Sequence, residues 1–206
     1  MRTDSRRNAG KEVAVPLEPM GIFREWITAA GDAGTPLPTA MALATADAGG
    51  RPSVRYVLLK ESDETGFSFC TNRLSRKGRE IAENPHASLA FYWHDIGRQV
   101  RSEGRLTALS AGMVESLWQA RPLESQLSSL ASRQGALISD HRELLERYHE
   151  LAGEYEGRDI PCPPDWACYL LIPERIEFWT RGEPRLHHRE VFIREGEGWN
   201  RLLIQP

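Results

Sequence analysis

Three basic side chains alternate near the C-terminal end of the sequence, at Arg185, His187 and Arg189. In an extended strand, residues two apart point to the same face, so two guanidiniums and an imidazole would project together. The apolar run that ends at Trp179 places an indole close to them. Such a face suits an anionic, planar ligand, and a solvated edge strand is the structural alternative.

Two further positions are candidates for binding an anion. Arg55 interrupts an apolar strand pattern, and its burial would require an anionic ligand or a carboxylate partner. Ser75, Arg76 and Lys77 stand at a predicted helix start, where main-chain N–H groups, a hydroxyl and two cations favour a phosphate. The alternatives are a buried salt bridge for Arg55 and a solvated helix surface for the other three residues.

The composition argues against several classes of protein. A formal charge of −3 disfavours non-specific nucleic-acid binding, and no apolar run approaches the roughly 20 residues that cross a bilayer. Cys70, Cys162 and Cys168 are an odd number without C-x-x-C spacing, so we expect free buried thiols and a reducing cytoplasm. The histidines lack metal-ligand spacing, which predicts no metal site, and there is no Gly-x-Ser-x-Gly, Gly-x-Gly-x-x-Gly or P-loop motif.

Hydrophobic periodicity predicts a mostly β chain with helices, an α+β antiparallel barrel. Strands alternate with turn-rich breaks, and the helices gather at the start and after the fifth strand, which disfavours a parallel βαβ sheet. Residues 1–15 are predicted to be a flexible N-terminal arm, and residues 16–206 a single domain. Strands are expected over 40–45, 53–60, 66–71, 87–93, 98–109 (with a bulge at Gly104), 166–172 running on into 176–179, 187–194 and 199–204, and helices over 17–31, 75–84, 110–120, 123–130 and 139–155.

Six motifs in the same order and spacing resemble the pyridoxamine 5′-phosphate oxidase family, from about Pro19 to Pro206. They are Arg55-Tyr56-Val57-Leu58-Leu59-Lys60, Thr71-Asn72 with Ser75-Arg76-Lys77, Arg98-Gln99-Val100, Arg121-Pro122, Ser132-Arg133-Gln134, and Ile176-Glu177-Phe178-Trp179 followed by Arg185-Leu186-His187.

The resemblance implies an FMN-binding split β-barrel with flanking helices, and a homodimer with FMN at the subunit interface. It implies that Arg55, Lys60, Cys70, Thr71, Arg76, Lys77 and Gln99 hold FMN from one subunit, and that Gln134, Gly135, Trp179 and Arg189 hold it from the other. Tyr56, Val57, Leu58 and Ser75 complete the expected cofactor set.

The same resemblance implies an oxidase of pyridoxamine or pyridoxine 5′-phosphate, with O2 as the final acceptor and H2O2 as a product. The expected substrate residues are Lys60, Leu117, Arg121, Ser125, Arg185 and His187, with Arg185 and His187 at the catalytic face. Leu117 stands where the family has a tyrosine on the substrate phosphate, and Gly135 where it has a serine. The family's Trp-Gly-Gly-Tyr reads Trp166-Ala167-Cys168-Tyr169.

These departures leave two alternatives. A sister group on the same scaffold oxidises tricyclic dihydrophenazine intermediates in phenazine biosynthesis and also lacks the tyrosine. A flavin-binding split barrel without turnover is the non-enzymatic alternative. Lys60, Arg121 and Ser125 together favour a small aromatic substrate with a phosphate, so the vitamin B6 reaction is preferred.

Overall fold

The computed structural model describes residues 18–206, so the predicted arm at 1–15 lies outside the described residues. Thirteen elements follow the order expected from periodicity. The helices are α1 (Pro19–Asp32), α2 (Arg76–Glu83), α3 (Ala111–Gln119), α4 (Leu123–Ala131) and α5 (His141–Glu154). The strands are β1 (Ala40–Ala46), β2 (Pro52–Leu58), β3 (Phe67–Asn72), β4 (His86–Trp93), β5 (Arg98–Ala108), β6 (Trp166–Thr180), β7 (His188–Glu195) and β8 (Gly198–Leu203).

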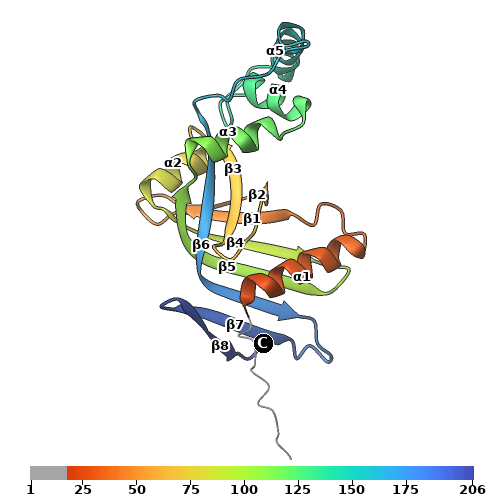
Figure 1. Ribbon diagram of the computed structural model, residues 1–206, viewed down its shortest axis with the longest axis vertical. Helices are drawn as coiled ribbons and strands as arrows, with labels where there is room; N and C mark the ends of the chain where they lie inside the picture. Colours follow the sequence, from red (N-terminus) through yellow and green to blue (C-terminus); the bar gives the residue numbers. More distant parts are fainter. Residues whose placement is uncertain (1–17) are drawn as a thin grey trace, which may run out of the picture.

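All strand pairs are antiparallel, in the order β2-β1-β4-β5-β6-β7-β8, with β3 pairing with β6. The 15-residue strand β6 organises the sheet, because its first half pairs with β3, its second half pairs with β7, and β5 runs along nearly all of it. Figure 1 shows β6 as the long curved strand that links the helical end of the molecule to the β7–β8 hairpin. The predicted split-barrel α+β fold is confirmed.

The bulge predicted at Gly104 is also confirmed. The β5–β6 register shifts between Glu103 and Gly104, opposite Pro173. A Cβ atom on Gly104 would lie 2.0 Å from the carbonyl oxygen of Ile172, so only glycine allows the two backbones to approach this closely.

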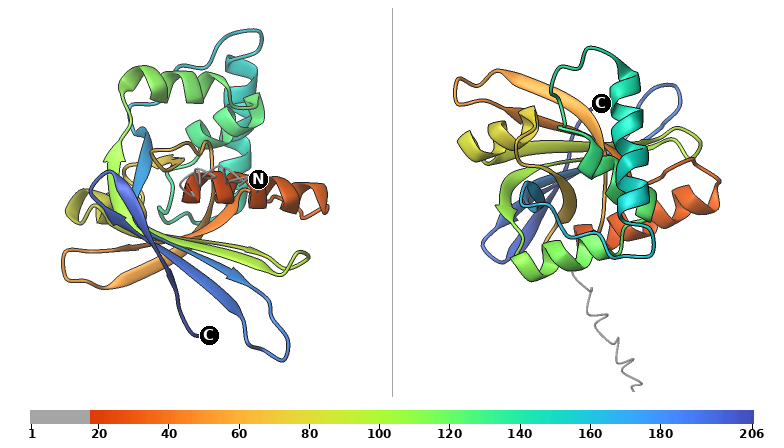
Figure 2. Two further views of the ribbon diagram at one scale, coloured as in Figure 1. Left: turned by 60° about the horizontal axis from the view of Figure 1, so that its bottom comes forward. Right: turned by 90° about the horizontal axis from the view of Figure 1, so that it is seen from above.

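Two apolar clusters fix the helices against the strands. In the larger one, α1 covers the sheet, and the Phe23 ring lies 4.8 Å from Phe67 and 5.0 Å from Phe91. The smaller one joins α3, α4 and the segment before β6 through Trp118, whose indole N–H donates to the carbonyl of Ile160 at 2.8 Å. Figure 1 shows α3, α4 and α5 gathered at one end of the molecule, away from α1, and Figure 2 gives two further views of them, so the two clusters stabilise different parts of the molecule.

The prediction of three free thiols was wrong. Cys70 in β3 and Cys168 in β6 are directly opposite each other and form a disulfide, while Cys162 remains free. The two cysteines are 98 residues apart in the sequence, so only the β3–β6 register brings them together. The expectation of a reducing cytoplasm therefore loses the support that it drew from the cysteines.

None of the helices found between residues 18 and 206 is long and apolar enough to cross a membrane.

Candidate active site

The start of α2 forms the first cationic group of the site. Ser75 caps the helix by accepting a hydrogen bond from the N–H of Gly78 at 3.2 Å. Lys77, in the first turn, is buried, and its ammonium group donates to the hydroxyl of Thr71 at 3.2 Å and to the side-chain oxygen of Gln134 at 3.1 Å. Burial, and then the positive charge of Arg55, lower the pKa of Lys77. A phosphate would find oriented donors and positive charge here.

Arg55 points from β2 into a set of acceptors on β1 and α2. Its Nη1 donates to the carbonyl of Leu43 at 3.0 Å and to the hydroxyl of Thr45 at 2.7 Å. Its Nη2 donates to Ser53 and lies 3.3 Å from the carboxylate of Glu80. The ion-pair alternative for Arg55 is therefore confirmed. Glu80 is a site residue that the sequence analysis missed, although its spacing of four residues from Arg76 was a possible signal.

Arg121 and Lys60 face a pair of adjoining cavities between β2, β3 and α4. The cavities measure about 310 and 410 Å³, and Arg121, Ser125, Ser129, Gln134 and Trp166 line both of them. Tyr56, Val57, Leu58, Lys60, Cys70, Thr71 and Lys77 line the smaller cavity, as the resemblance implied for cofactor residues. Partial desolvation, and then the nearby charge of Arg121, lower the pKa of Lys60.

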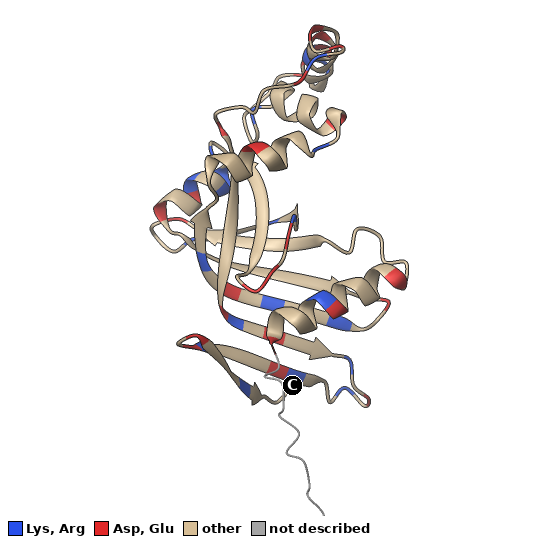
Figure 3. Ribbon diagram, viewed as in Figure 1, with Lys and Arg blue, Asp and Glu red and all other residues tan. Residues whose placement is uncertain are grey.

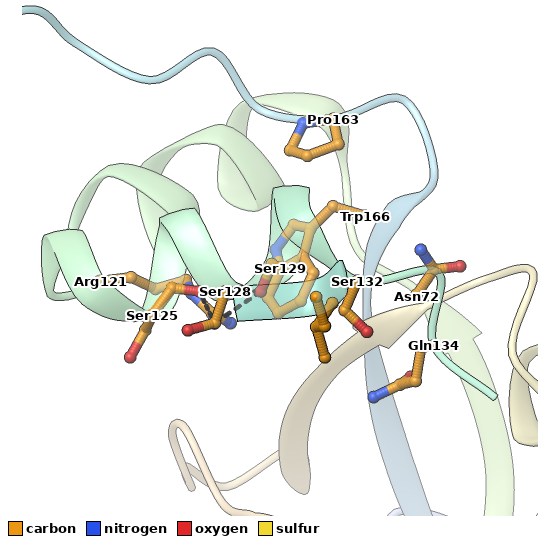
Figure 4. Close-up of a pocket in the computed structure, with 10 residues that line it drawn as sticks. Asn72, Arg121, Ser125, Ser128, Ser129, Ser132, Gln134, Pro163 and Trp166 are labelled. Atoms are coloured by element: carbon orange, nitrogen blue, oxygen red, sulfur yellow. Dashed lines mark hydrogen bonds between the residues drawn. The ribbon is translucent and has the colours of Figure 1, made fainter. Parts of the chain in front are cut away.

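Arg121 is held in place by aromatic stacking and by α4. Its guanidinium lies 4.1 Å from the centre of the Trp166 ring and 5.4 Å from that of Trp118. Its Nη2 donates to the carbonyl of Ser125 at 2.8 Å and to the hydroxyl of Ser129 at 3.0 Å, as Figure 4 shows. The Nε of Arg121 is buried and has no hydrogen-bond partner among residues 18–206, which leaves a donor for an anionic ligand.

Leu117 is half-buried on α3, one residue before Trp118, and is not among the residues that line these two cavities. Gly135 adopts a φ of +86° directly after Gln134, a backbone conformation that favours glycine over the family's serine.

A second group of predicted residues lies at the far end of β6. Gln99 in β5 is directly opposite Trp179, and Trp179 is directly opposite Arg189 in β7, so all three project from one face of the sheet. His187 packs against Trp179 with ring centres 4.6 Å apart and ring planes tilted by 46°, and its Nδ1 accepts a hydrogen bond from the N–H of Gly182 at 3.2 Å. Arg185, in the same loop, has a φ of +87°, which is uncommon for a residue other than glycine.

A buried carboxylate anchors the arginines of this second group. Glu177 is 1% exposed and accepts hydrogen bonds from Arg101 in β5, from Arg175 in β6 and from Arg189 in β7. These bonds hold the pKa of Glu177 below its usual range despite burial. Figure 3 shows acidic and basic positions side by side on β5 and β6 in this part of the sheet. Arg189 is thus fixed from within the chain.

The two groups stand at opposite ends of β6. A fully extended strand of its 15 residues would be roughly 50 Å long, and Figure 1 shows its two ends far apart in the curved sheet. We call the group around Lys77 and Arg121 the first half-site and the group around Trp179 and His187 the second half-site. One chain cannot close them around a single small molecule.

The structure shows the neighbours of two expected cofactor residues within one chain, while their division between subunits stays a prediction. Gln99, which was expected to act with Lys77, lies in the second half-site, opposite Trp179. Gln134, which was expected to act with Trp179, accepts a hydrogen bond from Lys77 in the first half-site. Strand register and the α4 connection decide these positions, and neither can be read from motif order.

Comparison with known proteins agrees with the fold and shows the family. The family model described as pyridoxamine 5′-phosphate oxidase matches residues 27–153, and the model of the pyridoxine 5′-phosphate oxidase C-terminal dimerisation region matches residues 166–206. A pyridoxine/pyridoxamine 5′-phosphate oxidase of Anaeromyxobacter dehalogenans is 47% identical, covering 92% of this chain and 96% of the relative. Another, of Rubrobacter xylanophilus, is 45% identical, covering 100% of this chain and 95% of the relative.

Solved structures give the same result. PhzG from Burkholderia lata 383, in complex with tetrahydrophenazine-1-carboxylic acid, superimposes with a TM-score of 0.89 at 35% identity, covering 94% of this chain and 95% of that one. An FMN-binding protein of Nostoc punctiforme shares the fold, with a TM-score of 0.73 at 22% identity, covering 89% of this chain and 97% of that one. The C-terminal match supports a homodimer. The chain is an FMN-dependent oxidoreductase that belongs to the pyridoxamine 5′-phosphate oxidase family.

Proposed function

We propose that this protein oxidises pyridoxine or pyridoxamine 5′-phosphate to pyridoxal 5′-phosphate, with O2 as the final acceptor and H2O2 as the second product. The observation that carries the proposal is the cationic wall of Lys60 and Arg121 beside Ser125, facing a cavity of about 310 Å³. The names of the relatives at 47% and 45% identity support the same substrate class.

FMN would lie between the first half-site of one protomer and the second half-site of the other. The donors around Lys77, Arg76 and Ser75 suit the cofactor phosphate, because charge-assisted hydrogen bonds to phosphate oxygens are strong. Trp179, Gln99 and Arg189 would then approach the flavin ring from the partner. When bound, FMN supplies the hydride acceptor and the site of reaction with O2. The separation of the two half-sites along β6 supports this arrangement in a homodimer.

Arg121 and Lys60 would bind the phosphate of the substrate. Arg121 is already oriented by Trp166 and by two oxygens of α4, so little side-chain freedom is lost on binding. Its unpaired Nε offers a further N–H to an anion. Ser125 lines the same cavity and adds a hydroxyl.

Arg185 and His187 of the partner would orient the substrate ring. Because Nδ1 of His187 accepts the N–H of Gly182, the proton of the neutral imidazole lies on Nε2. His187 therefore presents a hydrogen-bond donor, suited to an oxygen on the ring. Its contact with the Trp179 ring helps to hold the imidazole in place.

Oxidation of a dihydrophenazine-type tricycle is the second candidate. Two observations favour it: the structural relative that binds tetrahydrophenazine-1-carboxylic acid, and the apolar Leu117 in place of a phosphate-binding tyrosine. One missing bond to an anion weakens binding by about 1.5–3 kcal/mol, or roughly ten- to a hundredfold.

Anaerobic reduction of the purified yellow protein separates these functions. We expect flavin absorbance to bleach with pyridoxine or pyridoxamine 5′-phosphate and to return with air. Bleaching by a dihydrophenazine carboxylate alone would reverse the ranking. Bleaching by neither would favour a flavin-binding protein without turnover. Arg185→Ala or His187→Ala protein that is still reduced at the normal rate would remove these residues from the substrate face.

A further inference from the structure

Glu80 is a buried carboxylate that lines, with Arg76, a cavity of about 360 Å³ beside the first half-site. Neither motif order nor the family comparison assigns it a role. It lies on α2, is 4% exposed, and receives hydrogen bonds from three elements. One carboxylate oxygen accepts from Thr45 of β1 at 2.5 Å, from Ser53 of β2 at 2.6 Å and from Arg55 of β2 at 3.3 Å. The other accepts from Nε of Arg76 at 2.8 Å.

These contacts fix two arginines in different ways. The hydroxyls of Thr45 and Ser53 each donate to Glu80 and accept from Arg55, so the Arg55 guanidinium is enclosed on two sides. Arg76 is held by Nε alone, its side chain is 67% exposed, and its two terminal nitrogens bond to nothing among residues 18–206. Glu80 therefore orients the Arg76 fork while leaving four N–H groups for a ligand.

The carboxylate also sets the charge around the start of α2. Arg55, Arg76 and Lys77 carry three positive charges, and Glu80 carries one negative charge, which leaves a net charge of +2. A phosphate monoester carries about −1.5 to −2 at neutral pH, so the charges match. Without Glu80, Arg55 would be half-buried with neutral partners only, and Arg76 would lose the hydrogen bond that orients its guanidinium.

We propose that Glu80 is the positioning residue for cofactor phosphate recognition. It holds the Arg76 fork in the geometry that distinguishes FMN from riboflavin, and it keeps the positive charge of Arg55 beside that fork. The inference rests on the proposed placement of the FMN phosphate at α2. Glu80 is expected to affect binding of the phosphate and not of the flavin ring, so its effect differs from a general effect on folding.

The test compares the dissociation constants of FMN and riboflavin for the apoprotein dimer, measured by quenching of flavin fluorescence. In Glu80→Gln protein we expect the preference for FMN over riboflavin to fall about tenfold or more, with riboflavin binding nearly unchanged. Glu80→Asp, which keeps the charge, should retain part of the preference. Glu83→Gln is the matched control, because Glu83 lies on the same helix, is exposed, and within residues 18–206 bonds only to the N–H of Ala48.

Each outcome has a distinct meaning. Equal preferences in Glu80→Gln and wild-type protein would overturn the role of Glu80. Equal losses in Glu80→Gln and Glu83→Gln would also overturn it, because the effect would then follow total charge and not position. Parallel weakening of FMN and riboflavin would show a structural role only. A wild-type protein without preference for FMN over riboflavin would instead refute the placement of the phosphate at α2. Circular dichroism of each apoprotein establishes that it is folded.

Discussion

Replacing Glu177 by glutamine should destabilise the β5–β6–β7 end of the sheet more than any surface charge change. The carboxylate is 1% exposed and is the shared acceptor of Arg101, Arg175 and Arg189. Glutamine keeps the size and one acceptor oxygen. It removes the charge and turns an NH2 group toward guanidiniums, which are donors only.

The magnitude follows from the burial of each partner. Breaking a fully buried ion pair costs about 3–5 kcal/mol. The three arginine side chains are 43%, 29% and 23% exposed, so water screens part of the loss. We therefore expect a loss of about 3 kcal/mol in the free energy of unfolding. For a domain of this size, that corresponds to roughly 6–12 °C in melting temperature.

Thermal unfolding at a fixed dimer concentration, followed by circular dichroism, measures this loss. Glu103→Gln is the matched control, because Glu103 contacts Arg175 at 3.4 Å from a side chain that is 52% exposed. That change should cost less than about 1 kcal/mol. A Glu177→Gln protein that melts within about 2 °C of the Glu103→Gln protein would refute the reasoning, since burial of the shared acceptor would then have no energetic consequence.

Three further predictions concern thiols, substrate binding and acid. Alkylation of the native, unreduced protein should modify Cys162 alone, and all three cysteines should react only after reduction. Three reactive thiols without reductant would contradict the disulfide. Arg121→Lys should raise the KM for a phosphorylated substrate about tenfold while FMN binding stays unchanged, because an ammonium group cannot reproduce both the stacking on Trp166 and the bonds to α4. An unchanged KM in steady-state assays would place the substrate phosphate elsewhere. Although burial raises it, the pKa of Glu80 is lowered overall from 4.5 to about 2 by hydrogen bonds and by the charge of Arg76. The ionised carboxylate therefore adds roughly 3 kcal/mol to the free energy of unfolding above pH 4.5, and this contribution is lost as the pH falls toward 2. The stabilities of wild-type and Glu80→Gln protein, measured by urea titration, should converge in that pH range.

The order of the helices and strands was predictable from local pattern. Period-two runs, the Ser75 cap and the Gly104 bulge each depend on interactions within a few residues, and the structure has all of them. The motifs also identified the family, because six short segments in register constrain each other even when each is weak. The candidate phosphate-binding residues followed from the chemistry of basic side chains at a helix start.

Contacts between distant segments were decided only by the tertiary structure. Cys70 and Cys168 were predicted to be free because nothing in their spacing reveals the β3–β6 register that pairs them. The neighbours of Gln99 and Gln134 within the chain could not be predicted either, because they are set by sheet pairing and by the path from α4.

The two buried carboxylates show most clearly which features the sequence predicts and which only the tertiary structure decides. Glu80 and Glu177 look like ordinary surface residues in the sequence, since charge and helical or strand spacing place them among other polar positions. Their importance comes from burial beneath arginines, which arrive from two elements at Glu80 and from three at Glu177. The sequence determined which basic side chains are available to bind an anionic cofactor and substrate. The fold determined where those cations point, because a guanidinium is oriented by the acceptors that surround it in three dimensions.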